Sequence, residues 1–274
     1  EISHCFVSSL SLKILPVLFF MYLYFLSSAV GVVCGIGGGV IIKPVLDAFG
    51  VLDVAVISFL SGCTVLSMTT YSVVKSKIGG TSYVDKRTGI PLALGAALGG
   101  VAGKELFSWI LEFCSDKNKV GAVQAVCLLI VTAGTFIYTI YKKKIRTLHV
   151  TNRILCAMIG MALGIMSSFL GIGGGPINLV VLYFFFSMQT KAAVENSLYI
   201  IFFSQIANLV TALVTGSVPE FSFGLLILMV FGGISGGVVG RALVKKIEDD
   251  TVDRLFRVLM GIIILINIYN IYKF

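Results

Sequence analysis

The chain has 274 residues, of which 57% are hydrophobic and only 12% charged, and its mean hydropathy is +1.01. A soluble domain of this size needs more charge to cover its surface, so the composition excludes one and indicates a membrane protein. The net charge of +8 does not indicate nucleic-acid binding, because the cations lie in loops between apolar runs, as the positive-inside bias predicts.

Apolar runs near 20 residues recur along the chain, and each is long enough to cross a hydrocarbon core of about 30 Å as a helix. Two shorter pieces, 40–49 and 176–187, are too short to cross unaided, so we expect half-helices or re-entrant segments there. The sequence thus predicts an all-α polytopic protein of the cell membrane, with a first run that is retained rather than cleaved as a signal peptide. The predicted spans are 12–34, 54–75, 89–111, 120–141, 152–170, 192–214, 222–243 and 254–272.

An internal repeat divides the chain into two halves. Residues 35–39 read Gly-Ile-Gly-Gly-Gly, and the same five residues recur at 171–175. The stretch 99–104 (GGVAGK) matches 236–241 (GGVVGR) at nearly the same offset. The predicted units are a first membrane repeat at 11–141, a basic cytoplasmic linker at 142–150 and a second membrane repeat at 151–272.

The loop charges predict that the second repeat is inverted relative to the first. The loop after the second span carries Lys75, Lys77, Lys86 and Arg87, whereas its counterpart at 215–222 has Glu220 and no cation. Three cations instead follow the seventh span, so the positive loops swap places between the halves. An inverted repeat needs an odd number of crossings in each half, so we expect the short segment after each glycine cluster to count as a fifth. Loops 75–88, 142–153 and 244–253 would then all be cytoplasmic.

The glycine clusters predict a helix break with an anion site. Each glycine costs roughly 1 kcal/mol relative to alanine in a helix, so five residues with four glycines should interrupt it. The half-helix that follows offers free N–H groups and a positive dipole end, and Pro176 is typical of a first helical position. One cluster alone would favour simple close packing of helices, but two matched copies favour a substrate site. The predicted ligands are the backbone N–H groups of Gly37, Gly38, Gly39, Gly173, Gly174 and Gly175.

Polar side chains within the spans give further candidates. Residues 197, 204, 208, 211 and 215 are Ser, Asn or Thr spaced three, four or seven apart, which places them on one helix face. Such a stripe faces either a water-filled path or a neighbouring helix, and both interpretations stay open. An amide donates to an anion without the cost of a buried charge, so Asn196 and Gln205 are predicted substrate ligands, together with Ser58 on the matching span.

Charged residues near the membrane are weaker candidates. Glu195 lies near the start of the sixth span and could carry a coupling proton, or its side chain could snorkel to the interface. Lys43 follows the first glycine cluster, has an apolar counterpart in the second half and could also snorkel. Lys104 and Arg241 are matched in the repeat, and we interpret each as marking a helix end.

Other kinds of site are not predicted. The six cysteines contain no C-x-x-C pair, and the sequence shows no metal cluster, nucleophile–base pair or Walker loop. We therefore expect no cofactor, no metal and no enzyme activity. Transport would be passive or coupled to an ion such as a proton or sodium.

The residues resemble the TauE/SafE sulfite-exporter family of membrane permeases over nearly the whole chain. The resemblance lies in the two glycine clusters, in the AVENS stretch at 193–197 and in the closing hairpin from Gly240 to Gly261. It implies transport of a small sulfur-containing anion such as sulfite, thiosulfate or an organosulfonate. The first half has Ile-Ser-Phe at 57–59 where the second has Glu-Asn-Ser at 195–197, so the half-sites need not be equivalent.

The leading hypothesis is therefore a secondary transporter that binds its anion between the two glycine clusters. One repeat would rock against the other to alternate access. The alternatives are an anion channel with the same filter and a membrane assembly factor that transports nothing. An intramembrane enzyme is disfavoured, because no acid–base pair appears at membrane depth.

Overall fold

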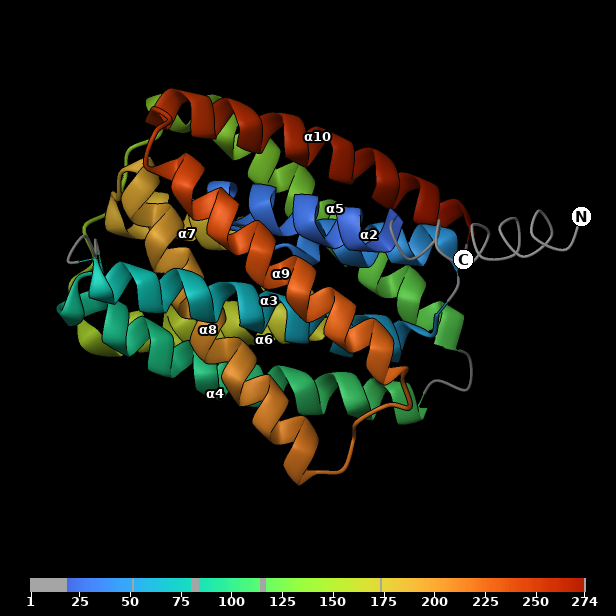
Figure 1. Cartoon of the computed structure of the whole chain (residues 1–274). Helices are drawn as coiled ribbons and strands as arrows, with labels where there is room; N and C mark the ends of the chain where they lie inside the picture. The colour runs from blue at the N-terminus through green and yellow to red at the C-terminus, as the bar shows by residue number, and fades with distance from the viewer. Residues whose placement is uncertain (1–18, 51, 80–83, 114–116, 173, 274) are drawn as a thin grey trace, which may run out of the picture.

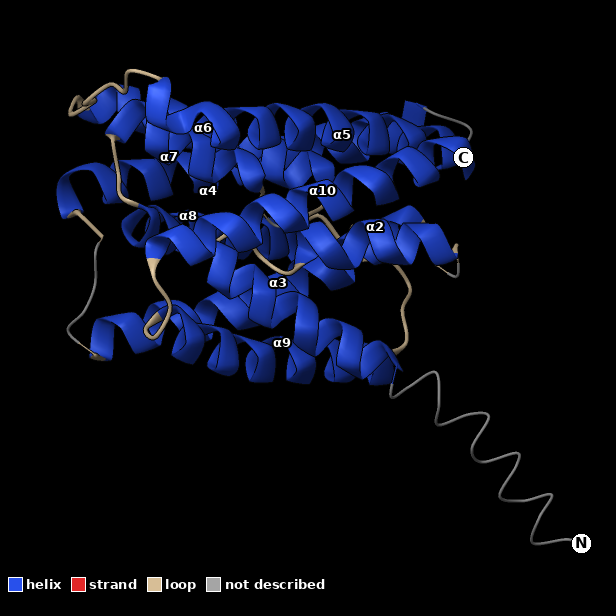
Figure 2. Ribbon diagram, turned by 90° about the horizontal axis from the view of Figure 1, so that it is seen from above, coloured by secondary structure: helices blue, strands red, loops and turns tan. Residues whose placement is uncertain are grey.

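A computed structural model describes residues 19–273 of the chain, apart from 51, 80–83, 114–116 and 173. Helices, turns and loops make up this part, and none of it is strand (Figures 1 and 2), which confirms the all-α prediction. A helix at Phe19–Cys34 precedes α2 (Gly39–Phe49), α3 (Val54–Ile78), α4 (Lys86–Phe113), α5 (Lys117–Tyr141), the 3-10 turn η1 (Lys142–Lys144), α6 (Arg153–Leu170), α7 (Pro176–Phe186), α8 (Thr190–Val214), α9 (Phe223–Val244) and α10 (Asp249–Lys273).

Among these helices, seven are long and apolar enough to cross a membrane: α3 to α6 and α8 to α10. They match seven of the predicted spans, because a length near 20 apolar residues is a reliable signal. The remaining span, 12–34, begins outside the described residues, and its described part forms the helix at Phe19–Cys34. The chain is thus a multi-pass membrane protein.

The two short helices turn back toward the end from which the chain came. The Phe49 ring at the end of α2 lies 5.7 Å from the Phe19 ring at the start of the first helix, in a T-shaped pair. Likewise, the Leu148 N–H, just before α6, donates at 2.7 Å to the Phe184 carbonyl near the end of α7. Eleven helical residues cover only about 16 Å, half of a hydrocarbon core. Each short helix therefore forms a re-entrant hairpin with the helix before it: the first hairpin is the helix at Phe19–Cys34 with α2, and the second is α6 with α7. The predicted fifth crossing in each half is wrong.

The two hairpins start from opposite ends of the bundle (Figure 1). Helices α3, α5 and α9 all finish at one end, which we call the basic end because cations gather in the loops there. The Lys142–Asp253 ion pair, at 2.5 Å, joins the ends of two of these loops. The second hairpin starts at the basic end and the first at the opposite end. Three full crossings after each hairpin give the odd number that an inverted repeat needs, and the inverted repeat itself stays a prediction.

The main helix contacts that join the two halves come in matched pairs. Helix α4 packs on α6 as α9 packs on the first helix, and α4 on α8 as α3 on α9. Glycines bring the backbones together: a Cβ added at Gly95, Gly99 or Gly103 of α4 would collide with a backbone carbonyl of α6. Gly236 and Gly240 of α9 meet the first helix in the same way. These glycines serve close helix packing, as small residues do in membranes.

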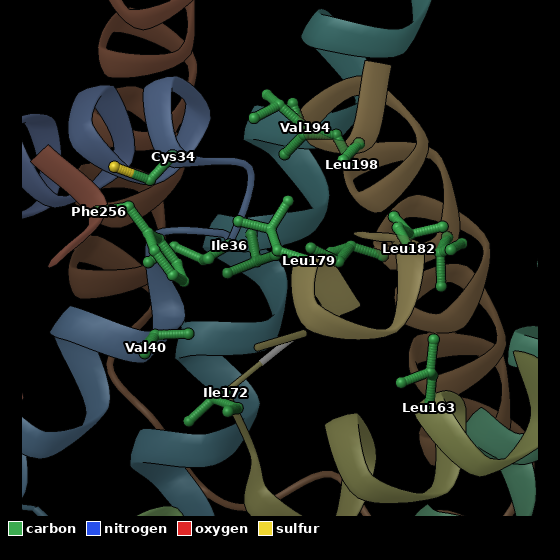
Figure 3. Close-up of a cluster of buried hydrophobic side chains, with 14 of the residues drawn as sticks. Cys34, Ile36, Val40, Leu163, Ile172, Leu179, Leu182, Val194, Leu198 and Phe256 are labelled. Carbon is green, nitrogen blue, oxygen red and sulfur yellow. The ribbon is translucent and has the colours of Figure 1, made fainter. Parts of the chain in front are cut away.

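The largest buried cluster lies around the glycine clusters at the middle of the bundle. Ile36 and Ile172, the isoleucines of the two clusters, are 0% and 1% exposed. They pack among side chains from the first helix, α2, α7, α8 and α10, as Figure 3 shows with Cys34, Val40, Leu179, Val194 and Phe256. The apolar core therefore fixes the position of both breaks relative to the crossing helices.

Candidate functional site

The two glycine clusters are chain breaks that touch each other. The first glycine break (35–39) turns at Gly35 and Gly37, whose φ angles are +66° and +77°. The second (171–175) turns at Gly171 and Gly174, at +64° and +124°. These angles lie in the left-handed region that favours glycine. A Cβ added at Gly39 would collide with the Ile172 carbonyl oxygen, so the breaks are in direct backbone contact.

Each break also packs against a crossing helix of the other half. The Ser197 hydroxyl of α8 donates at 2.5 Å to the Gly35 carbonyl, and Gly35 lies against the Val194 backbone. In the second break, Gly171 lies against the Ser58 side chain of α3. The predicted convergence of the two breaks is therefore present. Each break is clamped by a helix that belongs to the opposite repeat.

The half-helices begin at the breaks without a capping side chain. Helix α2 starts at Gly39 after Gly38, and α7 starts at Pro176 after Gly175, which is extended. No side chain among the described residues caps either start. The third N–H group of each helix, that of Ile41 or Asn178, donates to the carbonyl before the helix, and the Gly37 N–H donates at 3.4 Å to the Gly31 carbonyl, so Gly37 is not a free donor in this conformation. The N–H groups of Gly38 and Gly39 are left for another acceptor. The Ile201 side chain lies against Gly174 and covers the second break. Gly173, a predicted ligand, lies outside the described residues.

Buried hydroxyl and amide groups gather around the breaks. Several have no hydrogen-bond partner among the described residues, although each is out of contact with solvent. An orphaned buried polar group costs about 1–3 kcal/mol, so such a cluster favours a site that accepts water or a polar solute. Among the orphaned atoms are the hydroxyl oxygens of Ser28, Ser58, Ser61, Ser167, Ser168 and Ser204, the side-chain oxygen of Asn178 and the side-chain nitrogen of Gln205.

A small cavity opens beside the second break, toward the opposite end of the bundle. Its volume, measured as the space open to the centre of a water molecule, is about 40 Å³. Its polar side chains come from four helices: Ser58 and Cys63 of α3, Lys104 of α4, Ser168 of α6, and Gln205 and Asn208 of α8. We call it the outer cavity. It has room for a few water molecules, since one needs at least about 10–15 Å³ by this measure.

A much larger cavity lies at the basic end. It measures about 520 Å³ and is lined by α3, α4, α8 and α9, with Ser72, Ser76, Glu195 and Arg241 among its polar residues. An adjoining cavity of about 210 Å³ shares Glu195 and Arg241 and adds Lys191 and Lys245. We call the two together the inner cavity. The Ser76 hydroxyl donates to the Glu195 carboxylate across its wall.

The outer and inner cavities are lined by corresponding positions of the two repeats. The shift that carries Gly35 onto Gly171 carries one lining onto the other along α3 and α8. It pairs Glu195 with Phe59, so the sequence comparison of 57–59 with 195–197 is two residues out of register. The shift that carries Gly103 onto Gly240 does the same along α4 and α9. The pairs, outer residue first, are Ser58 with Val194, Phe59 with Glu195, Gly62 with Leu198, Cys63 with Tyr199, Asn208 with Ser72, Leu209 with Val73, Ala212 with Ser76, Lys104 with Arg241 and Phe107 with Val244.

The side chains that the sequence predicts as substrate ligands or coupling groups lie in different places. Ser58 and Gln205 line the outer cavity, and Glu195 lines the inner one. Asn196 lines neither: its side-chain amide donates at 2.9 Å to the Ala192 carbonyl in its own helix. Its side-chain oxygen is directed toward Gly89 of α4. Asn196 therefore contributes to helix packing in this conformation, while Ser58 and Gln205 remain in place to contact a solute.

The structure corrects the roles that the sequence suggested for the cations within the helices. Lys43 does not snorkel: it is 1% exposed and forms a 3.0 Å ion pair with Asp47, one turn further along α2. Lys104 lies nine residues before the end of α4, so it does not mark a helix end. Arg241 does lie in the last turn of α9, but it lines the inner cavity. The match between Lys104 and Arg241 in the two halves of the sequence was the feature that could have identified them as cavity-lining residues.

Comparison with known proteins agrees with this architecture. The chain matches the family described as sulfite exporter TauE/SafE over residues 20–267. It is similar to probable membrane transporter protein YunE of Bacillus subtilis, with 22% identity over 90% of this chain and 94% of that protein. A shorter similarity, 26% identity over 40% of this chain and 18% of that protein, links it to probable membrane transporter protein MamO of Paramagnetospirillum magneticum. No solved structure matches. The chain therefore belongs to the TauE/SafE sulfite exporter family of membrane transporters.

Proposed function

We propose that the chain is a secondary transporter of small sulfur-containing anions such as sulfite, thiosulfate or organosulfonates. The observation that carries the proposal is the pair of matched cavities at the two ends of the bundle, separated by the two touching glycine breaks. A channel would need one continuous path, whereas two cavities separated from each other by the breaks suit a carrier that opens to one end at a time. The family name supports the choice of a sulfur anion.

In this proposal the anion binds at the breaks, between the two cavities. The predicted donors are the N–H groups of Gly38 and Gly39 at the positive end of α2 and of Gly174 and Gly175 at that of α7, together with Gly173. The Gly37 N–H donates at 3.4 Å to the Gly31 carbonyl and would have to leave that bond to contact the anion. The Ser58 hydroxyl and the Gln205 amide add side-chain donors from α3 and α8. Donors of this kind bind an anion without burying a compensating cation, which would be costly at membrane depth.

Access alternates when one repeat rocks against the other. Glu195 is the candidate for coupling, because its carboxylate lines the inner cavity beside the pathway and accepts from Ser76. Its counterpart in the outer cavity is Phe59, so a coupling group of this kind would serve the basic end alone. A proton or a sodium ion on Glu195 would neutralise a charge that otherwise repels the anion.

The test is uptake into proteoliposomes of labelled sulfite, thiosulfate and a small sulfonate. Chloride and a neutral solute serve as controls, and each solute is measured with and without a pH gradient. Saturable uptake of one sulfur anion, with no uptake of the neutral solute, is the expected result. A current too large for a carrier would indicate an anion channel. Folded protein that moves none of the sulfur anions would overturn the proposal and favour an assembly factor.

A further inference from the structure

We propose that Lys104 and Arg241 are the anion-binding cations of the two access routes. The anion would contact Arg241 when it comes from the basic end and Lys104 when it comes from the opposite end. This inference rests on the transport function proposed above. It goes beyond that function because it assigns two side chains, one to each end of the pathway.

Arg241 is a cation of the inner cavity that forms no ion pair with the described residues. It lines both parts of that cavity, and its Nε atom is buried with no hydrogen-bond partner. No acidic oxygen of the described chain lies within 4 Å of its guanidinium, although Glu195 lines the same cavity. The Arg241 side chain is partly exposed in the cavity, so its guanidinium is accessible to an anionic solute there, and charged residues at such sites often mark a substrate pathway.

Lys104 occupies the position in the outer cavity that corresponds to that of Arg241 in the inner one. Its ammonium lies 5.7 Å from the centre of the Phe107 ring, a cation–π contact, and the described residues offer it no carboxylate within 4 Å. Nine residues, or about 13 Å of helix, separate it from the end of α4. Gln205 and Asn208 line the cavity with it, so a solute there would meet one cation and two amides.

Because the two cavities differ in volume, a solute can reach one of the two cations more easily than the other. The inner cavity of about 520 Å³ leaves room for a solute beside Arg241, whereas the outer cavity of about 40 Å³ holds only water beside Lys104. If the two repeats exchanged conformations, the outer cavity would widen around Lys104 and the inner one would close around Arg241. The matched pair therefore predicts that the two cations contact the anion in turn.

The two side chains should hold an oxyanion differently. A guanidinium presents a planar fork that matches two oxygens of one anion, whereas an ammonium acts as a point charge. Replacement of Arg241 by Lys should therefore weaken binding from the basic end. Replacement of Lys104 by Arg keeps the charge and should preserve binding from the opposite end.

The experiment measures half-saturation of thiosulfate transport from each end, in right-side-out and inverted membrane vesicles. A charge-assisted hydrogen bond contributes roughly 1.5–3 kcal/mol, which corresponds to about a tenfold to hundredfold change in affinity. Arg241→Gln should raise the half-saturation concentration by about that factor at the basic end and by less than about threefold at the other. Lys104→Gln should show the reverse. Matched controls are Arg153→Gln at the basic end and Lys119→Gln at the opposite end, both exposed.

Equal shifts at both ends, or shifts no larger than those of the controls, would overturn the assignment. If a Gln variant fails to fold, the charge-keeping pair Arg241→Lys and Lys104→Arg still tests it. Arg241→Lys must then change half-saturation at the basic end alone, and equal changes at both ends would refute the proposal. Wild-type vesicles that transport no sulfur anion would instead refute the proposed function, which separates the two failures.

Discussion

The contact between the two glycine breaks can be tested with one methyl group. In Gly39→Ala, the new Cβ would collide with the Ile172 carbonyl oxygen and lie 2.8 Å from both the Ile172 carbonyl carbon and the Ser61 hydroxyl. Ordinary contacts of a Cβ lie at 3.4–4 Å, so both neighbours must move away by more than half an ångström. Ile172 is 1% exposed and held by the core, so that movement disturbs the packing around both breaks.

The expected cost follows from overpacking, about 1–3 kcal/mol, less a gain of up to about 1 kcal/mol because alanine favours a helix more than glycine does. The net loss is about 1–2 kcal/mol, or a fall of several degrees in the apparent melting temperature measured in detergent. The matched control is Gly134→Ala in α5, where a Cβ would meet nothing within 4 Å. That substitution should raise the melting temperature, since only the propensity gain of about 1 kcal/mol applies.

Thiosulfate uptake by the same two proteins completes the test. Gly39→Ala should slow uptake more than its stability loss explains, because the added methyl obstructs movement of one break past the other. Gly134→Ala should transport at the wild-type rate. If Gly39→Ala melted as high as Gly134→Ala and transported normally, the two breaks would not be in contact and the central site would be refuted.

Three further predictions concern buried polar groups. Lys43→Met leaves the Asp47 carboxylate buried without its partner and should lower stability by about 3–5 kcal/mol. The double change Lys43→Met/Asp47→Leu removes both charges and should cost much less. Thermal unfolding of the wild-type, single-variant and double-variant proteins decides this. Ser197→Ala removes the donor to the Gly35 carbonyl and should lower the free energy of unfolding by about 1 kcal/mol. Ser204→Ala should change it little, because the Ser204 hydroxyl has no partner among the described residues. Denaturation in detergent compares the two variants. Glu195→Gln should abolish stimulation of uptake by a pH gradient and leave gradient-independent uptake intact, and an unchanged response to the gradient would remove Glu195 from coupling.

The crossing helices could be predicted from the sequence because the required signal is local. A run of about 20 apolar residues specifies a span, and a glycine cluster specifies a break. The direction of the chain after a break is different, because it depends on the left-handed turns at Gly35 and Gly171 and on packing of Phe49 against Phe19. No periodicity in the sequence encodes that contact, and the predicted fifth crossing was wrong for this reason.

The site was only partly predictable for a similar reason. Repeated glycines identified the centre, and Ser58 and Gln205 lie close to it. The sequence could not show that Asn196 donates to its own helix while its neighbour Glu195 faces a cavity, since a rotation of about 100° per residue separates their directions. The depth of Lys104 depends on where α4 ends, which composition alone defines poorly.

The most direct test of alternating access is thiol labelling at one matched pair of positions. Cys63 lines the outer cavity, and Tyr199, its counterpart, lines the inner one, so Tyr199→Cys supplies the second probe. Each thiol is placed alone in a cysteine-free background and treated with a membrane-impermeant reagent from each side. We expect each thiol to react from its own end only, and the transported anion to change the two labelling rates in opposite directions. Labelling of both thiols from both ends, or parallel changes in their rates, would contradict alternating access and indicate an open channel.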